Sequence, residues 1–216
     1  DLYSATGGGI PGMHPGFESD GAGAWRQPGR VRLTSTGGIN VINKIQEVIN
    51  GIQHPARTKL KIFFLCSVAG GTGSGTIVDL VYMTRHVLET NFAGLYNNTC
   101  IFGYIFSPSA CEGGINEERK PGANHYAAMK EIAYLMRLGD RGEKIKMNYG
   151  ITNVTFNRNI FDTCMIVDGD TPAFGGFINR AKTARNVVVQ SILGCMTATV
   201  TNRGNTTTLI DSVFSN

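Results

Sequence analysis

The hydrophobic positions of this chain follow two alternating patterns. Continuous apolar runs of strand length lie at residues 61–68, 99–106 and 160–167. Around them, apolar residues recur three or four positions apart, the spacing of one helix face. This spacing predicts helices at 38–52, 75–90, 123–138 and 182–200, and a short one at 173–178. Residues 1–37 are rich in glycine and proline and are expected to form a loop.

Strands that alternate with helices and are apolar on both faces are typical of a parallel sheet covered on both sides. The predicted fold is therefore α/β: a Rossmann-like, three-layer arrangement with a parallel sheet between helices. Right-handed crossovers bring the carboxyl ends of all strands to one edge, where ligands bind in such sheets. We expect the loops that follow residues 68, 106 and 167 to meet there.

The composition is typical of a globular protein and indicates neither a nucleic-acid partner nor a membrane span. The 216 residues are 42% hydrophobic and 17% charged, which is typical of a globular protein with a sizeable core. The net charge of +4 is mild and the basic residues are scattered, so no nucleic-acid partner is indicated. No apolar run reaches membrane-spanning length, and the N-terminus lacks the apolar core of a signal peptide.

The five cysteines are odd in number and have no C-x-x-C spacing, and the four histidines are isolated from one another. We expect reduced core cysteines in a cytoplasmic protein, and we identify no metal site made of protein side chains.

A glycine-rich segment joins the first predicted strand to the next helix. Glycines let the backbone approach a ligand and adopt positive φ, and a helix N-terminus favours anions. The segment therefore predicts a phosphate site. A Walker loop would need a lysine before its Ser or Thr, and the glycines are too clustered for a dinucleotide-binding G-x-G-x-x-G. A turn without function is the alternative. The candidate residues are Ala69, Gly70, Gly71, Thr72, Gly73, Ser74 and Gly75.

This AGGTGSG segment resembles the GGGTGSG signature loop of the tubulin/FtsZ superfamily, with Ala69 in place of the first glycine. In that family the loop binds the phosphates of GTP. The resemblance implies a bacterial tubulin-like protein that binds GTP or GDP with Mg²⁺. It also implies head-to-tail assembly with itself into cytoplasmic filaments, and hydrolysis of GTP to GDP and phosphate at the interface between subunits.

An upstream segment extends the resemblance. It resembles a tubulin loop that senses the terminal phosphate, and it reads Gly21, Ala22, Gly23, Ala24, Trp25 and Arg26. Either Arg26 or Arg30 would place a cation near that phosphate. The alternative is a surface turn with solvated arginines.

Downstream, Ser107-Pro108-Ser109 followed by Glu112 resembles the family loop that contacts ribose. Glu112 is the candidate carboxylate, with Glu117 and Glu118 as competitors. Asp168 occupies a guanine-contacting position where the family usually has Asn, and Asn186 occupies the second such position. For each of the last two, an ordinary polar residue of a loop or helix start is the alternative.

The resemblance also implies a domain organisation. Residues 1–37 would be a loop-rich segment with the phosphate-sensing loop, residues 38–201 the nucleotide-binding α/β domain, and residues 202–216 the start of the connection to a C-terminal domain. The first strand and its phosphate loop are expected to precede this chain. In the family, the loop after the core helix completes the neighbour's site. Asn205 and Asp211 are the weak catalytic candidates there, without clear motif spacing.

Two other functions remain open at this point. A tubulin-like scaffold would bind nucleotide with little or no hydrolysis, and the degenerate spacing between Asn205 and Asp211 favours it. An NAD-dependent oxidoreductase would suit the sheet and the glycine-rich turn. The glycine spacing disfavours the oxidoreductase, as does the lack of an acidic residue at the end of a second strand.

Overall fold

The computed structural model describes residues 26–35, 38–52, 60–111, 121–149, 153–169 and 180–197. The structural statements below concern these residues.

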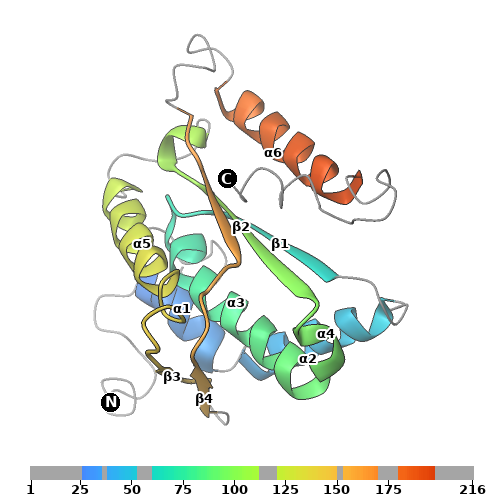
Figure 1. Ribbon diagram of the computed structural model, residues 1–216. Coiled ribbons are helices and arrows are strands. Elements are labelled where there is room, and N and C mark those ends of the chain that lie inside the picture. Colours follow the sequence, from blue (N-terminus) through green and yellow to red (C-terminus); the bar gives the residue numbers. More distant parts are fainter. Residues whose placement is uncertain are drawn as a thin grey trace.

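A three-stranded parallel sheet forms the centre of the fold (Figure 1). Its strands lie in the order β1 (Leu60–Ser67), β2 (Thr99–Phe106) and β5 (Thr163–Val167). The register pairs Ser67 with Phe106, and Phe106 with Val167. The three strands therefore end side by side, which confirms the predicted parallel sheet and places the loops that follow them at one edge.

Helices cover both faces of this sheet, as the α/β prediction requires (Figure 1). One face packs against α3 (Gly71–Asn91), with α1 (Arg26–Ser35), α2 (Gly38–Gly51) and α5 (Pro121–Leu135) on the same side. The other face packs against α6 (Arg180–Thr197). The remaining elements are α4 (Ala93–Tyr96), η2 (Pro108–Ala110) and an antiparallel pair formed by β3 (Ile145–Asn148) and β4 (Asn153–Phe156).

The alternation of side chains along the strands produces two cores. On the α3 side, Ile101 and Ile105 of β2 pack with Ile77 and Val81 of α3. On the α6 side, aromatic residues of β1 and β2 contact α6, and the rings of Phe63 and Phe102 stack with centroids 5.0 Å apart.

Polar contacts also join α6 to the sheet. Tyr104 Oη and Ser191 Oγ lie 2.8 Å apart, and Lys61 Nζ donates to Cys195 O at 2.6 Å. The C-terminal part of α6 is thereby held over the beginning of β1.

The structure corrects the sequence prediction in four places. Residues 26–35 form helix α1 within the segment expected to be a loop. Helix α3 begins at Gly71 rather than at residue 75, so it includes most of the glycine-rich segment. Strand β5 begins at Thr163, and β3 and β4 were not expected. The short helix predicted at 173–178 lies outside the described residues.

The late start of β5 has a clear cause. Ile160 and Phe161 are fully buried, but regular pairing with β2 begins only at Thr163. Ile160 N donates to Leu135 O at 3.1 Å, and Asp162 N donates to Ile101 O at 2.9 Å. The Asp162 carboxylate also accepts the Ile101 amide at 2.6 Å. The buried apolar run in the sequence therefore begins three residues before the strand does.

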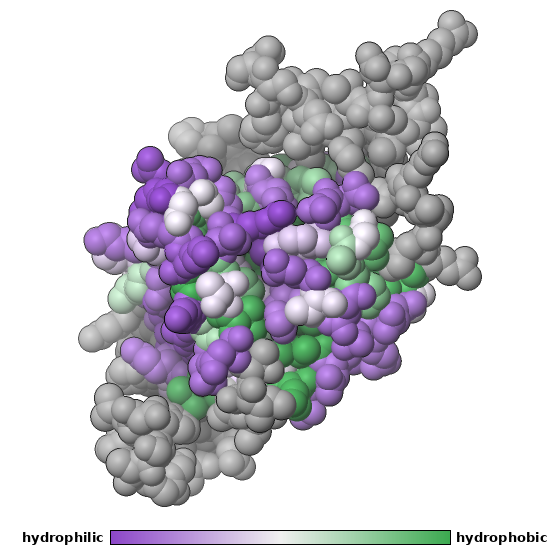
Figure 2. All heavy atoms as spheres, turned by 60° about the horizontal axis from the view of Figure 1, so that its bottom comes forward, coloured by the Kyte–Doolittle hydropathy of each residue, from purple (hydrophilic) through white to green (hydrophobic). Residues whose placement is uncertain are grey.

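The lower side of the molecule in Figure 1 is mostly hydrophilic, with hydrophobic side chains visible between polar ones (Figure 2). An apolar groove of about 410 Å³ lies between α2 and β1, lined by Val48, Ile52 and Phe63 among others. Among the described helices, none is both long and apolar enough to span a membrane.

Candidate functional site

The glycine-rich segment forms the N-terminus of α3, directly after β1. Gly70 is the N-cap residue and is extended, with φ −95° and ψ 165°. Gly70 O accepts both the amide of Ser74 at 3.2 Å and its hydroxyl at 2.6 Å. In an α-helix, the amides of the N-cap and first turn have no carbonyl partner one turn earlier. With the positive end of the helix dipole, this geometry makes the N-terminus of α3 a candidate anion site.

Two glycines of this segment are required by close packing. A Cβ atom on Gly73 would lie 2.1 Å from Ser67 O and 2.9 Å from Cys66 Sγ. A Cβ atom on Gly75 would lie 2.2 Å from Arg26 O. Among the described residues the positive-φ glycine is Gly142, so positive φ is not the reason for glycine at residues 73 and 75. Glycine is needed here because strand β1 and helix α1 both approach the first turns of α3.

The turn between β1 and α3 is fixed by neighbouring elements. Val68 N donates to Phe106 O at 3.1 Å, and Ala69 N donates to Ser67 Oγ at 3.3 Å. Asn124 of α5, itself buried, donates its Nδ2 to Ala69 O at 3.2 Å. The sequence analysis does not predict a role for Asn124. The feature that could have indicated one is an amide side chain near the start of a helix with an apolar face.

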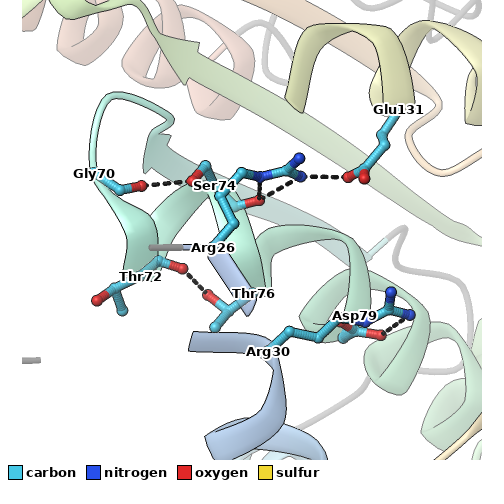
Figure 3. A network of polar contacts seen from close by, with 8 residues as sticks. All are labelled: Arg26, Arg30, Gly70, Thr72, Ser74, Thr76, Asp79 and Glu131. Atoms are coloured by element: carbon cyan, nitrogen blue, oxygen red, sulfur yellow. Dashed lines mark hydrogen bonds and ion pairs between the residues drawn. The ribbon is translucent and has the colours of Figure 1, made fainter. Parts of the chain in front are cut away.

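Arg26 connects three helices beside this loop (Figure 3). Its Nε and Nη2 donate to Ser74 O of α3 at 3.1 and 2.9 Å. Its Nη2 also forms an ion pair with Glu131 of α5.

One turn further along α1, Arg30 Nε pairs with Asp79 Oδ2 of α3 at 3.0 Å. Burial raises the pKa of Asp79, while Arg30 and a hydrogen bond from Tyr149 act in the opposite direction.

A second polar cluster joins the loops after β2 and β5. Ser107 Oγ donates to Asp168 Oδ1 at 2.9 Å, and Ser109 Oγ bonds the same oxygen. Gly169 N donates to Ser109 Oγ at 3.1 Å, and a Cβ atom on Gly169 would lie 2.2 Å from Ser109 O. The Asp168 carboxylate is therefore held at the carboxyl edge of the sheet. Asp168 is exposed to solvent there.

A cavity of about 500 Å³ opens at this edge on the side of α6. It is lined by the ends of β1 and β2, by Cys111 after η2, and by Arg185 of α6. Cys111 Sγ lies 3.1 Å from Ser67 Oγ. The pKa of the neighbouring Cys66 thiol is raised to about 12, chiefly by burial. Sequence reasoning did not find Arg185, although it adjoins the candidate Asn186.

A comparison with known families identifies the chain. The profile of a family described as tubulin like matches residues 13–211. This chain belongs to the tubulin-like family. A search of curated proteins finds no match. The family match confirms the resemblance first seen in the AGGTGSG segment, and the three-layer α/β fold is consistent with it.

In this tubulin-like protein, the structure brings several of the predicted site residues to one sheet edge. The loop Ala69–Gly75 and Asp168 lie at the ends of β1 and β5, and Asn186 is exposed on α6 next to Arg185. Other predicted residues lie outside the described part of the chain: Gly21, Ala22, Gly23, Glu112, Glu117, Glu118, Asn205 and Asp211.

Within the described ranges, no group of three or more His, Cys, Asp or Glu residues is placed to hold a metal ion.

Proposed function

We propose that this tubulin-like protein binds a guanine nucleotide, GTP or GDP, across the carboxyl edge of its sheet. The observation that carries the proposal is the position of residues 70–74. They form the N-cap and first turn of α3 immediately after β1, in register with the ends of β2 and β5. Membership of the tubulin-like family favours GTP over the nicotinamide dinucleotide of the alternative interpretation.

The phosphates would lie at the first turn of α3. The amides of a helix's first turn have no carbonyl partner one turn earlier, and the macrodipole adds a partial positive charge at the same end. Packing at Gly73 and the bond from Asn124 to Ala69 O hold these amides in place before any ligand arrives. Mg²⁺ usually keeps several waters and binds phosphate oxygens, so it would be held chiefly by the nucleotide itself.

The base would lie toward β5 and α6. Guanine presents its N1–H and exocyclic amino group as donors, and one carboxylate accepts both. Asp168 has this chemistry, and Ser107 and Ser109 orient it. The cavity of about 500 Å³ beside Arg185 has the size of a small-molecule site, and Asn186 is the second candidate for the base. Glu112 is the proposed ribose contact.

We further propose that the protein assembles head-to-tail in the cytoplasm of a bacterium and hydrolyses GTP at the junction of two subunits. Catalysis would rest on charge stabilisation by backbone amides and Mg²⁺, with a polar residue of the neighbour orienting water. Asn205 and Asp211 are the candidates for that residue. Their poor fit to the family's spacing supports the second candidate function, a filament scaffold that binds GTP and hydrolyses it slowly or not at all.

Phosphate release measured against protein concentration distinguishes these two functions. For a GTPase completed by a neighbouring subunit, the rate per subunit rises as sedimentable filaments form. Asn205→Ala or Asp211→Ala then lowers the rate while sedimentation persists. Filaments that bind GTP and release no phosphate at any concentration would support the scaffold. If the protein neither sediments nor releases phosphate with GTP, both assembly proposals are wrong.

A further inference from the structure

The peptide group that joins Ala69 to Gly70 is held by a side chain from another helix. Its carbonyl oxygen, Ala69 O, accepts Nδ2 of Asn124 in α5 at 3.2 Å. Ala69 and Asn124 are both buried, whereas Gly70 is exposed. The bond therefore connects the protein interior to the residue at which the proposed anion site begins.

The peptide groups on either side have partners close by in the chain. On the strand side, Ala69 N donates to Ser67 Oγ at 3.3 Å. On the helix side, Gly70 O accepts the amide and the hydroxyl of Ser74, at 3.2 and 2.6 Å (Figure 3). Between them, the 69–70 peptide group is held by Asn124, which lies 55 positions away from Ala69.

The orientation of this peptide group determines where the Gly70 amide points. A peptide group is planar and trans, so its C=O and its N–H point in opposite directions. Because Ala69 O is directed at α5, the N–H of Gly70 is directed away from α5. This amide is the first of the N-cap and first-turn donors that an anion would meet at α3. The bond from Asn124 thus directs one donor of the proposed anion site.

Glycine at residue 70 makes this control necessary. Gly70 has φ −95° and ψ 165°, an extended conformation that any residue adopts. Reversal of the 69–70 peptide group would turn φ of residue 70 to about +85°. Glycine enters that region at little cost, whereas a residue with a Cβ atom does not. In the reversed orientation a carbonyl oxygen replaces the amide at the anion site and repels phosphate.

We propose that Asn124 is a positioning residue for phosphate binding, which keeps the 69–70 peptide group in the orientation that presents the Gly70 amide to the ligand. It acts through Ala69 O and does not touch the nucleotide. Without it, the reversed orientation competes, and the affinity falls with the fraction of molecules in the competent orientation. This inference rests on the proposed guanine-nucleotide function.

The test is a double-mutant cycle in which calorimetry measures the affinities for GTP and for GDP. The variants are Asn124→Ala, Gly70→Ala and Asn124→Ala/Gly70→Ala. We expect Asn124→Ala to bind both nucleotides about tenfold more weakly, which corresponds to about one-tenth of the molecules in the competent orientation. In the Gly70→Ala background the same substitution should cost less than about threefold, because alanine disfavours the reversed orientation. Any obstruction of the ligand by the new methyl group is common to both Gly70→Ala proteins and cancels from the comparison.

Two further variants separate this role from a loss of stability. Asn124→Asp keeps the shape of the side chain but replaces its donor with an acceptor, so it should weaken binding in the same direction. If Asn124→Ala does not fold, the cycle is run with Asn124→Asp. Ile132→Val shortens a buried side chain about two turns further along α5. It should lower the melting temperature without nucleotide and leave both affinities unchanged.

Three results would overturn the inference while leaving the proposed function intact. Unchanged GTP and GDP affinities in Asn124→Ala and Asn124→Asp would show that the bond does not position the site. An equal loss of affinity with glycine and with alanine at residue 70 would show that Asn124 does not act through the orientation of the 69–70 peptide group. A loss of affinity in Ile132→Val as large as that in Asn124→Ala would show a purely structural role. If wild type binds neither nucleotide, the proposed function fails and the inference fails with it.

Discussion

Ser67 at the end of β1 and Gly73 in the first turn of α3 are in such close contact that no side chain fits between them. A Cβ atom on residue 73 would lie 2.1 Å from the Ser67 carbonyl oxygen, a distance that real Cβ atoms do not adopt. The obstacle is backbone, which cannot swing aside as a side chain does. The first turn of α3, where the proposed anion site lies, is thereby fixed against the end of β1.

Gly73→Ala should therefore lower the free energy of unfolding by about 1–3 kcal/mol, the usual cost of overpacking a close contact. It should also weaken nucleotide binding, because the first turn of α3 is displaced from β1. Urea unfolding and a GTP titration measure the two effects. The control is Gly94→Ala, where a Cβ atom meets nothing within 4 Å. A Gly73→Ala protein as stable as the Gly94→Ala protein would contradict the packing argument.

Asp79 gives the stability a particular pH dependence. Burial raises its pKa above the ordinary value of 3.8, so the folded state binds this proton more tightly than the unfolded state. Its contribution to stability is therefore complete below pH 3.8 and is lost as the pH rises through the folded-state pKa.

Urea unfolding of wild type and Asp79→Asn at several pH values, from below 3.8 to above the folded-state pKa, isolates the contribution of Asp79 to stability. Asparagine does not titrate, so the wild-type free energy minus that of the variant should fall with rising pH and then level off. A difference that rises with pH would show that Arg30 outweighs burial.

Thiol labelling should discriminate among the cysteines. Burial raises the pKa of Cys66 to about 12 and that of Cys164 to about 11, against an ordinary value of 9.0. Because the thiolate is the reactive form, Cys66 should react with iodoacetamide at pH 8 at least about tenfold more slowly than a thiol of ordinary pKa. Mass spectrometry of peptides from folded and denatured protein measures the rates. Equally fast labelling of Cys66 in both states would contradict its partial burial near the end of β1.

Asp168 should determine the preference for the base. Asp168→Ala removes the carboxylate that would accept the N1–H and the amino group of guanine. The variant should bind GTP about tenfold or more weakly, the usual cost of losing hydrogen bonds to a charged group. Asp168→Asn introduces the residue that the family usually has at this position, and it should bind GTP more tightly than Asp168→Ala. Competition with a fluorescent nucleotide measures the affinities. Ser109→Ala, which removes one hydroxyl from the same carboxylate, should weaken GTP binding less than Asp168→Ala. Equal GTP affinity in wild type and Asp168→Ala would place the base elsewhere.

The sequence was sufficient to predict the parallel sheet and the strand-to-helix junction at which the candidate anion site lies. Strands β1 and β2 are apolar runs; β1 is half-buried and β2 is mostly buried, and β2 matches the predicted limits at residues 99–106. The AGGTGSG segment indicated the strand-to-helix junction, because glycines and hydroxyls at that point have few structural explanations. The position of Asp168 at the same carboxyl edge of the sheet followed from the parallel topology.

Helix α1 and the role of Arg26 were not predictable in the same way. Pro28 and Gly29 give the segment a loop-like composition, and its apolar content is low. The helix is stabilised by contacts with distant residues, including Ser74, Asp79 and Glu131. A guanidinium in a glycine-rich context suggests a phosphate ligand. Only the packing of α1 against α3 shows that Arg26 bonds a carbonyl oxygen and a carboxylate instead. The same limitation applies to Asn124, since its acceptor Ala69 O lies 55 positions away in the chain.

The most direct test of the central claim is a calorimetric titration of the protein with GTP and, separately, with ATP, both in the presence of Mg²⁺. The account predicts one GTP bound per chain and ATP bound at least about tenfold more weakly, because an acceptor-only carboxylate at Asp168 repels the N1 lone pair of adenine. No detectable heat with GTP, or equal affinity for the two nucleotides, would contradict a guanine-nucleotide site at the carboxyl edge of the sheet.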